Sequence, residues 1–271
     1  MGRCIFCLKS GDIFHTIEHI VPESLGNTDD ILKYGVCDQC QNYFGREIER
    51  YVLQKTPVGF WRTIAGTLTK KGKPPAFNPT QNPKSNGKLP DYHPQTDSGV
   101  IIHPGDGETI IDAEFSNDSL FDDVVTGKKK DFQIVLTPKI LVYLGRFLGK
   151  IALEYWYKSS GNDVFRKDFN ELRMYVRNGT TKDMWPILHG NLEENLLIYR
   201  PKDSDSEERT LYAYRFFDIN SLLFFCFDVG TERYSIILNQ KYPPGELFSD
   251  HVLSALCQGA KGLPNIFYYD L

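Results

Sequence analysis

The sequence predicts an α+β protein made of two parts, a small N-terminal unit of two strands and a helix and a larger mixed α+β domain with a largely antiparallel sheet. Three observations lead to this prediction. Two Cys-x-x-Cys pairs enclose residues 8–36 near the N-terminus. Residues 138–158 carry apolar side chains at the i, i+3, i+4 spacing of an amphipathic helix. Four candidate strands follow between residues 195 and 239, and they favour an antiparallel sheet packed beside helices.

The two cysteine pairs, Cys4 with Cys7 and Cys37 with Cys40, have the spacing of a tetrahedral zinc site. Each pair would place two thiolates on one side of the ion, at Zn–S distances of about 2.3 Å. Two disulfides would also satisfy the four cysteines. No secretory signal precedes Cys4, however, and we expect a reducing, cytoplasmic compartment. A zinc ribbon that only binds a partner is a further alternative. The other two cysteines are expected to be buried free thiols: Cys226 and Cys257.

Length and charge narrow the class of protein. The chain has 271 residues, of which 41% are hydrophobic and 13% aromatic, enough for a sizeable core in one or two domains. No run of about 18 apolar residues predicts a membrane-spanning helix. The net charge is −4, but residues 1–90 carry +4 and residues 91–271 carry −8. This asymmetry favours the N-terminal part as the region that contacts nucleic-acid phosphates.

The elements of the N-terminal unit follow from its composition. Residues 12–21 are rich in β-branched and aromatic side chains and are predicted to form a strand that ends at Pro22. Residues 23–30 are rich in turn formers, and residues 31–36 are predicted to form a second strand that returns to the second cysteine pair. After that pair, four apolar side chains at helical spacing predict a helix: Phe44, Ile48, Tyr51 and Val52.

Together these residues resemble the HNH endonucleases of the His-Me finger group, in the zinc-bearing branch whose motif begins Glu-His. The resemblance covers about residues 3–52. It rests on the two cysteine pairs, the run Glu18-His19-Ile20-Val21-Pro22-Glu23-Ser24-Leu25-Gly26, and the segment from Phe44-Gly45 to Ile48-Glu49. The resemblance implies a ββα-metal fold that holds a structural zinc ion, and it implies a metal-dependent nuclease activity.

The resemblance also implies a role for each residue of the Glu-His pair. His19 is expected to act as general base, and a neutral imidazole can indeed take a proton from water near pH 7. Glu18 is expected to be a ligand of a catalytic Mg²⁺ or Mn²⁺ ion, which would stabilise the scissile phosphate and the leaving oxygen. DNA is the expected substrate in preference to RNA, and this preference comes from the resemblance alone.

The sequence departs from the family pattern at the next cation ligand. The family usually has His or Asn directly after the fourth cysteine, whereas this chain has Gln41 there and Asn42 next. Either amide oxygen can bind a hard cation, and Asn42 is preferred because glutamine is longer and more flexible. Asn27 lies early in the loop between the strands, so its match to the family's central asparagine stays open. These departures are compatible with weak or lost activity.

Beyond the cysteine pairs and their helix the sequence is less informative. Arg62 and a lysine-rich run at residues 70–73 could contact phosphates, or they could begin a solvated loop. Residues 71–96 are rich in proline and predict a linker or an extended strap over the surface. We therefore divide the chain into the N-terminal unit (residues 1–70), this linker and a second domain over residues 97–271.

The second domain is predicted to combine two helices with several strands. Thr137 followed by Pro138 is a favourable N-cap and first-position pair for the helix over residues 138–158, and a second helix is expected over residues 163–176. This domain is expected to select a target, bind a ligand or form a homodimer, and the sequence leaves these roles open. Strands are expected at residues 101–102, 109–115, 132–136, 195–200, 210–217, 221–229 and 233–239.

The function predicted from the sequence is metal-dependent hydrolysis of phosphodiester bonds in DNA. His19 would activate water, Glu18 with Asn42 or Gln41 would hold a Mg²⁺ or Mn²⁺ ion, and the four cysteines would hold zinc. The alternative is a zinc-finger module that binds nucleic acid or protein without cutting it. The Glu-His pair favours the enzyme, because a module that only binds has no need of it.

Overall fold

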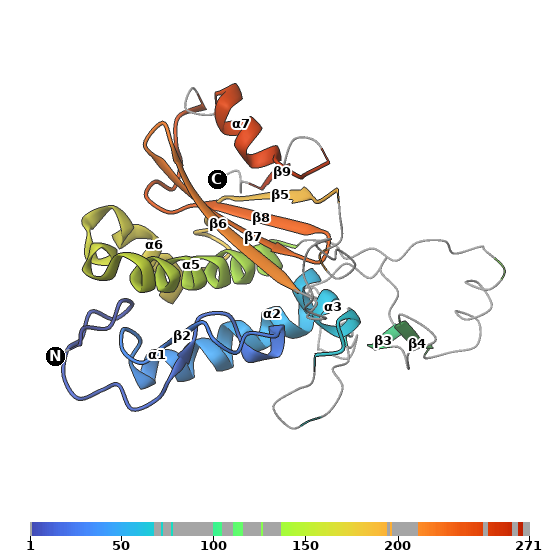
Figure 1. Cartoon of the computed structure of the whole chain (residues 1–271), viewed down its shortest axis with the longest axis horizontal. Helices are drawn as coiled ribbons and strands as arrows, with labels where there is room; N and C mark the ends of the chain where they lie inside the picture. Colours follow the sequence, from blue (N-terminus) through green and yellow to red (C-terminus); the bar gives the residue numbers. More distant parts are fainter. Residues whose placement is uncertain are drawn as a thin grey trace, which may run out of the picture.

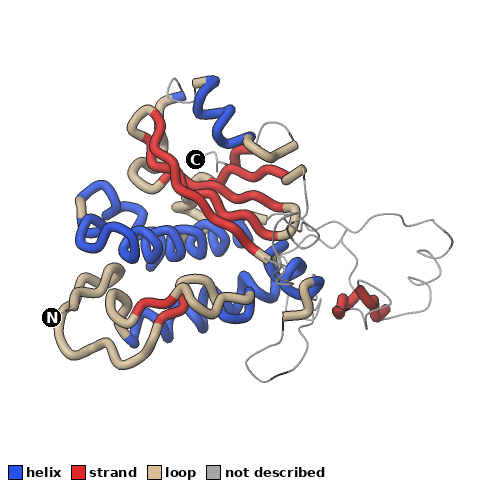
Figure 2. Tube along the Cα trace, in the orientation of Figure 1, coloured by secondary structure: helices blue, strands red, loops and turns tan. Residues whose placement is uncertain are grey.

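The protein is arranged in layers around one long helix. The computed structural model describes residues 2–67, 72, 77, 100–104, 111–115, 126, 137–193, 196, 211–245, 249–261 and 265–267. Figure 1 shows the N-terminal helices, then helix α5 with α6, then the antiparallel sheet, with α7 on the far face of that sheet. Figure 2 shows the same separation of helices and strands along the Cα trace. The predicted α+β class is confirmed.

The N-terminal unit contains two very short strands and a helical run. Strands β1 (Glu18–His19) and β2 (Ile31–Leu32) pair antiparallel, with Glu18 opposite Leu32 and His19 opposite Ile31. The 3₁₀ turn η1 (Glu23–Leu25) lies between them in the chain. The helical elements that follow are α1 (Asp38–Phe44), the π-helical turn η2 (Gly45–Glu49), α2 (Arg50–Lys55) and α3 (Pro57–Ile64).

The strands predicted over residues 12–21 and 31–36 were too long. Two consecutive backbone amides before β1 donate to the Asp38 carboxylate, at 2.9 and 3.0 Å, instead of pairing with a neighbouring strand. After β2 the chain turns at Gly35, whose φ is 112°, and the Gly35 carbonyl accepts a hydrogen bond from the Ile5 amide at 2.7 Å. In both places the backbone hydrogen bonds lead to the cysteine pairs and shorten the strand.

Helix α5 (Pro138–Ser160) is the centre of the fold, and the helix predicted over residues 138–158 is confirmed. The Thr137 hydroxyl accepts a hydrogen bond from the Ile140 amide at 3.3 Å, and Pro138 stands in the first turn, as the sequence predicted. The second predicted helix starts later than expected. Two 3₁₀ turns come first, η3 (Gly161–Phe165) and η4 (Lys167–Phe169), and α6 (Asn170–Asn178) follows them.

Helices α5 and α6 pack closely because α5 has glycine where they meet. A Cβ atom on Gly149 would lie 2.6 Å from Cγ2 of Val176, and one on Gly145 would lie 2.7 Å from the Tyr175 hydroxyl. Both distances are shorter than packed side chains allow. The two glycines therefore determine how near α6 lies to α5.

The C-terminal sheet has five antiparallel strands in the order β6-β7-β8-β5-β9. Neighbouring strands β6, β7 and β8 follow one another in sequence through tight turns, as expected for an antiparallel meander. A separate antiparallel pair is formed by β3 (Val100–Pro104) and β4 (Ile111–Phe115). The strands of the larger sheet are β5 (Ile187–Asn191), β6 (Tyr212–Ile219), β7 (Leu222–Val229), β8 (Glu232–Ile237) and β9 (Asn265–Phe267).

Five of the predicted strands of the second domain are confirmed within a few residues, by β3, β4, β6, β7 and β8. Strands β5 and β9 were not predicted. The strand predicted over residues 132–136 lies outside the described residues. So does the strand predicted over residues 195–200, apart from residue 196, which is a turn.

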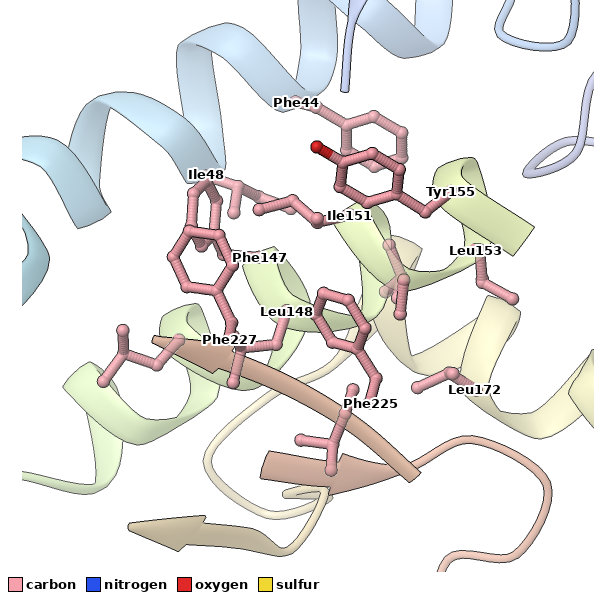
Figure 3. Close-up of a cluster of buried hydrophobic side chains, with 14 of the residues drawn as sticks. Phe44, Ile48, Phe147, Leu148, Ile151, Leu153, Tyr155, Leu172, Phe225 and Phe227 are labelled. Atoms are coloured by element: carbon pink, nitrogen blue, oxygen red, sulfur yellow. The ribbon is translucent and has the colours of Figure 1, made fainter. Parts of the chain in front are cut away.

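One hydrophobic core joins the N-terminal unit to the C-terminal elements within the described part of the chain. In Figure 3, Phe44 and Ile48 of the N-terminal helices lie on one side of α5, and Phe225 and Phe227 of β7 lie on the other. Phe147 of α5 meets Phe227 edge-on, with ring centroids 6.2 Å apart. The division of the chain around residues 71–96 stays a prediction, but the packed core is common to both parts.

Buried arginines of α5 and α6 also hold the N-terminal unit. Arg173 of α6 is 2% exposed and donates from Nε to the Ile5 carbonyl at 2.5 Å, within the first cysteine pair. Arg146 of α5 donates from Nη2 to the Tyr43 hydroxyl at 2.5 Å. The C-terminal part therefore determines where the first cysteine pair and α1 lie relative to α5.

The far face of the sheet is covered by α7 (Asp250–Cys257). Cys226 is buried and Cys257 is half-buried, and both are free thiols. No helix in the described ranges is long and apolar enough to cross a membrane. The small second core between α7 and the sheet consists of Leu188, Leu222, Phe224, Cys226, Ile237, Val252 and Leu256.

Candidate functional site

The four predicted zinc ligands lie together. The sulfur atoms of Cys4, Cys7, Cys37 and Cys40 are all within 4.8 Å of one another, and those of Cys7 and Cys37 are 3.6 Å apart. A tetrahedral ion with Zn–S bonds of about 2.3 Å needs sulfurs roughly 3.8 Å apart. The cluster therefore fits a structural zinc ion, and the four sulfurs would complete its coordination.

The ionisation of three of these thiols, Cys4, Cys37 and Cys40, explains why a cation suits this place. The Cys40 thiol donates to the Cys4 sulfur and lowers the pKa of Cys4 to about 4. Burial raises the pKa of Cys37 to about 11, and the hydrogen bond to Cys4, together with burial, raises the pKa of Cys40. The Cys4 thiolate thus opposes the ionisation of Cys37 and Cys40. A divalent cation removes this conflict, and an all-sulfur ligand set selects zinc over a hard cation such as Mg²⁺.

A cavity of about 590 Å³ opens between β1 with the turn η1 that follows it and the helices of the N-terminal unit. Its lining comes from β1, η1, α1, η2 and α2, and α3 adds one side chain. All four residues predicted to act in catalysis or cation binding contribute to the lining: Glu18, His19, Gln41 and Asn42.

His19 has a carboxylate beside its ring. Nε2 of His19 lies 3.3 Å from Oε1 of Glu23, and the histidine side chain is 26% exposed. A neutral imidazole that donates from Nε2 to this carboxylate keeps its lone pair on Nδ1. That lone pair can accept a proton, so the geometry is compatible with a general base in contact with the cavity.

Glu18 is more deeply placed than its position in the motif indicates. Its Oε1 lies 2.6 Å from Nζ of Lys150, and its side chain is only 9% exposed. Burial raises the pKa of Glu18, and the charge of Lys150 opposes that rise. Among the described residues, the other carboxylate oxygen has no hydrogen-bond donor. Glu18 therefore pairs with Lys150 through one oxygen while it also lines the cavity.

Lys150 is fully buried and contacts two further carboxylates. Oε1 of Glu49 and Oε2 of Glu154 each lie 3.0 Å from Nζ. Burial raises the pKa of Glu154 well above its ordinary value, so this carboxyl favours the protonated form. With Glu154 protonated, one ammonium lies beside two carboxylates, Glu18 and Glu49, and the cluster is short of positive charge. Both carboxylates line the cavity.

The two candidate amide ligands differ in what they contact. Nε2 of Gln41 donates to the carbonyls of Thr16 and Val36, each at 3.2 Å, and Oε1 of Gln41 accepts from the Thr16 hydroxyl at 2.5 Å. The Gln41 amide therefore ties the loop before β1 to α1. Asn42 is exposed, and its side chain has no hydrogen-bond partner within the described part of the chain. Of the two amides, Asn42 is the one that is available to a ligand in the cavity.

Asn27 organises the connection between β1 and β2. Its side chain is 4% exposed, and Nδ2 donates to the carbonyls of Val21 and Asp30 at 2.7 and 3.0 Å. Oδ1 accepts from the amides of Asp29 and Asp30 at 3.2 and 2.9 Å. All four hydrogen bonds are within the connection, so Asn27 has a structural role there and does not line the cavity.

Three arginines add positive charge to the cavity lining: Arg46, Arg50 and Arg62. Arg62 is 7% exposed, donates from Nε to the Ser24 carbonyl at 3.0 Å, and makes no ion pair with a described carboxylate. A guanidinium held in this way keeps its terminal N–H groups for an anion such as phosphate. The lysines at residues 70, 71 and 73 lie outside the described residues.

The cysteine pairs, the strand with the Glu-His pair and the helix after them occur in the order of one known family. Residues 4–57 match the family model for HNH endonucleases. The match begins at the first zinc ligand, Cys4, and includes every residue to which we assigned zinc binding, cation binding or catalysis. It confirms the resemblance and supports a nuclease-type function for the N-terminal unit. No curated protein and no solved structure matched the chain.

Sequence reasoning missed three side chains at this candidate site. Glu23 and Glu49 stand inside the motif runs, where they were read only as pattern residues. Lys150 lies far beyond the family match, and only the fold brings it to Glu18. One signal for it existed in the sequence. Lys150 and Glu154 are four residues apart on the apolar face of the predicted core helix, where charged residues are rare unless they are paired.

Proposed function

We propose that the protein is a metal-dependent endonuclease that hydrolyses phosphodiester bonds in DNA. The observation that carries this proposal is that His19, Glu18 and Asn42 line one cavity, within a unit that matches the HNH family. The zinc site is structural in this proposal, because four sulfurs fill a tetrahedral shell and leave no position for water or substrate.

His19 acts as the general base. Glu23 orients the imidazole through Nε2, and Nδ1 takes a proton from the water that attacks the phosphorus atom. The partial exposure of the ring leaves room for that water and for a phosphate beside it. The bond between phosphorus and the 3′ oxygen then breaks, and the departing oxygen takes a proton from solvent.

Glu18 and Asn42 would hold the catalytic cation, Mg²⁺ or Mn²⁺. A carboxylate and an amide oxygen are ligands that these hard cations prefer. Gln41 is the less suited amide, since its oxygen accepts the Thr16 hydroxyl. When bound, the cation supplies positive charge to the scissile phosphate and the leaving oxygen. The shortage of positive charge around Glu18 and Glu49 supports cation binding on this side of the cavity.

Arg62 binds a phosphate of the substrate. Its Nε bond to Ser24 directs the guanidinium, and no described carboxylate neutralises it. Arg46 and Arg50 line the same cavity, and Arg46 also pairs with Glu47 at 2.7 Å. A nucleic-acid backbone that passes the cavity would therefore meet several guanidinium groups close to His19.

The test is nicking of supercoiled plasmid DNA with Mg²⁺ or Mn²⁺, with the parent protein compared with His19→Ala. Loss of general-base catalysis lowers rates by about 10²–10⁴, so His19→Ala is expected to cut at least a hundredfold more slowly. Zinc content and thermal unfolding serve as controls and are expected to be unchanged, because His19 is partly exposed and is not one of the four clustered cysteines.

Equal cutting by both proteins would remove His19 as the general base. No cutting with either cation would replace the enzyme by a zinc-finger module that only binds. A parallel assay with single- and double-stranded RNA of the same sequence tests the choice of DNA. Faster cleavage of RNA than of DNA would contradict that part of the proposal while leaving the base and the cation in place.

A further inference from the structure

The ammonium of Lys150 contacts both residues that flank His19 in the sequence. Nζ lies 2.6 Å from the Glu18 carboxylate and 3.2 Å from the Ile20 carbonyl. Lys150 is 0% exposed and belongs to α5, outside the residues that match the HNH family. A side chain from a distant part of the chain therefore holds β1 on either side of the proposed base.

The same ammonium reaches the helical run that carries Asn42. Oε1 of Glu49, in η2, lies 3.0 Å from Nζ, and Glu49 and Glu18 both line the cavity. Lys150 is absent from the cavity lining. It therefore lies behind the cavity wall and links the strand on one side of the cavity to the helix on the other.

Stability alone is a weak explanation for this cluster. Buried ion pairs cost desolvation energy, and well-packed apolar replacements of such clusters are often neutral or stabilising. One oxygen of Glu154 is buried here without a hydrogen-bond partner, which adds a further cost. The cluster does fix the orientation of the Glu18 carboxylate, because its ion pair with Lys150 is only 2.6 Å long.

We propose that Lys150 is a positioning residue of the nuclease site, and that it acts through Glu18 by directing its carboxylate towards the catalytic cation. This inference rests on the proposed function. Lys150 itself touches neither substrate nor cation. Partners that orient metal-binding carboxylates change metal affinity or activity about 10–100-fold when they are removed. We expect an effect of that size here.

The test is a double-mutant cycle in the full-length, zinc-loaded protein. It compares Lys150→Met, Glu18→Gln and the double variant by Mn²⁺ binding, measured from the electron paramagnetic resonance signal of free Mn²⁺, and by plasmid nicking. Lys150→Met alone is expected to weaken Mn²⁺ binding at least tenfold and to slow cutting by a similar factor. In the Glu18→Gln background the same substitution is expected to change Mn²⁺ binding less than twofold, since its effect passes through Glu18.

Lys158→Met is the matched control. Lys158 stands two turns further along α5, is 41% exposed, and pairs with Asp30 at 2.6 Å rather than with Glu18. The same substitution there is expected to leave Mn²⁺ binding unchanged. A loss of Mn²⁺ affinity equal to that of Lys150→Met would mean that any disturbance of α5 has this effect, and it would overturn the proposal.

Equal losses of Mn²⁺ affinity in both Glu18 backgrounds would also overturn it, as would unchanged or tighter binding, or a parent that binds no Mn²⁺. If Lys150→Met does not fold, Lys150→Arg replaces it in the same cycle with the same expected result. If neither variant folds, the lysine is structural and the proposal is wrong. The proposed function fails by a different observation, when the parent cuts plasmid with neither cation while the Mn²⁺ binding cycle behaves as expected.

Discussion

Helix α5 makes different kinds of contact with its two neighbours, the C-terminal sheet and the N-terminal unit. Towards the sheet its contacts are aromatic and apolar, as where Phe147 meets Phe227. Towards the N-terminal unit it adds polar contacts to apolar ones. Lys150 binds the Glu18 carboxylate there, and the Tyr155 hydroxyl donates to Oδ2 of Asp30 at 2.6 Å.

The two kinds of contact have different effects, one on the stability of the fold and the other on the orientation of side chains. Apolar contacts stabilise the fold in proportion to the area they bury and do not depend on direction. Hydrogen bonds and ion pairs depend strongly on distance and angle, so they fix where a side chain points. The sheet side of α5 therefore contributes stability, while the side that faces the N-terminal unit also controls the geometry of the cavity. Each of the following predictions tests whether these effects are separable.

The largest effect is expected from Cys40→Ser, because zinc in such sites contributes apparent binding free energies of about 10–16 kcal/mol. This variant tests whether packing against α5 and α6 is sufficient to keep the N-terminal unit folded without zinc. We expect loss of zinc by metal analysis, a lower unfolding temperature and loss of cutting. Cys257→Ser, at a thiol outside the cluster, is the control and should keep one zinc per chain. A stably folded, active Cys40→Ser protein without zinc would contradict the structural role of the ion.

Phe227→Ala tests the sheet side of α5. Phe227 is 0% exposed, and its removal leaves a cavity against Phe147, so we expect a loss of about 3–5 kcal/mol in the free energy of unfolding. Denaturant unfolding measures this loss. Cutting and Mn²⁺ affinity per folded molecule are expected to stay within twofold of the parent. A tenfold loss of Mn²⁺ affinity in folded Phe227→Ala would show that the sheet side also controls the cavity.

Asn42→Ala and Gln41→Ala test the same separation within α1. Asn42→Ala is expected to weaken Mn²⁺ binding about 10–100-fold, the usual size for a residue that holds or orients a metal, with unchanged unfolding. Gln41→Ala removes the hydrogen bonds to Thr16 and Val36, so about 1–2 kcal/mol of stability is expected to be lost, with little change in Mn²⁺ affinity. The reverse pattern would make Gln41 the cation ligand.

The smallest effect is expected from Lys158→Met on stability. Its pair with Asp30 is partly exposed, and exposed ion pairs contribute about 0–1 kcal/mol. Denaturant unfolding is expected to show a change below 1 kcal/mol that shrinks further in high salt. A loss of several kcal/mol would show that the surface pair, and not only the buried ammonium, holds the connection between β1 and β2.

The sequence predicted the parts of the molecule that depend on local spacing. The four zinc ligands are recognised from two short Cys-x-x-Cys pairs. Glu18 and His19 are recognised because they are adjacent in the sequence. Helix α5 was predicted because its apolar pattern persists over twenty residues and begins at the capping pair of Thr137 and Pro138. In each of these cases the signal lies within a few residues of its structural result.

The sequence could not predict what depends on distant contacts. The first strand is short because amides before it bind the Asp38 side chain, and composition does not reveal that competition. The choice between Gln41 and Asn42 depends on which amide the loop before β1 engages. The partner of Glu18 was hidden for the same reason, because Lys150 comes into contact with it only after α5 has packed on the N-terminal unit.

The contact between Lys150 and the Ile20 carbonyl spans 130 positions of the chain. At a synthesis rate of 5–20 residues per second, a ribosome needs about 7–26 s to pass from one to the other. For most of that interval the four cysteines and the imidazole have already been synthesised, yet the ammonium that we propose directs the neighbouring carboxylate has not been made. Translation therefore completes the contacts of the proposed site late, after the codons for α5 have been read.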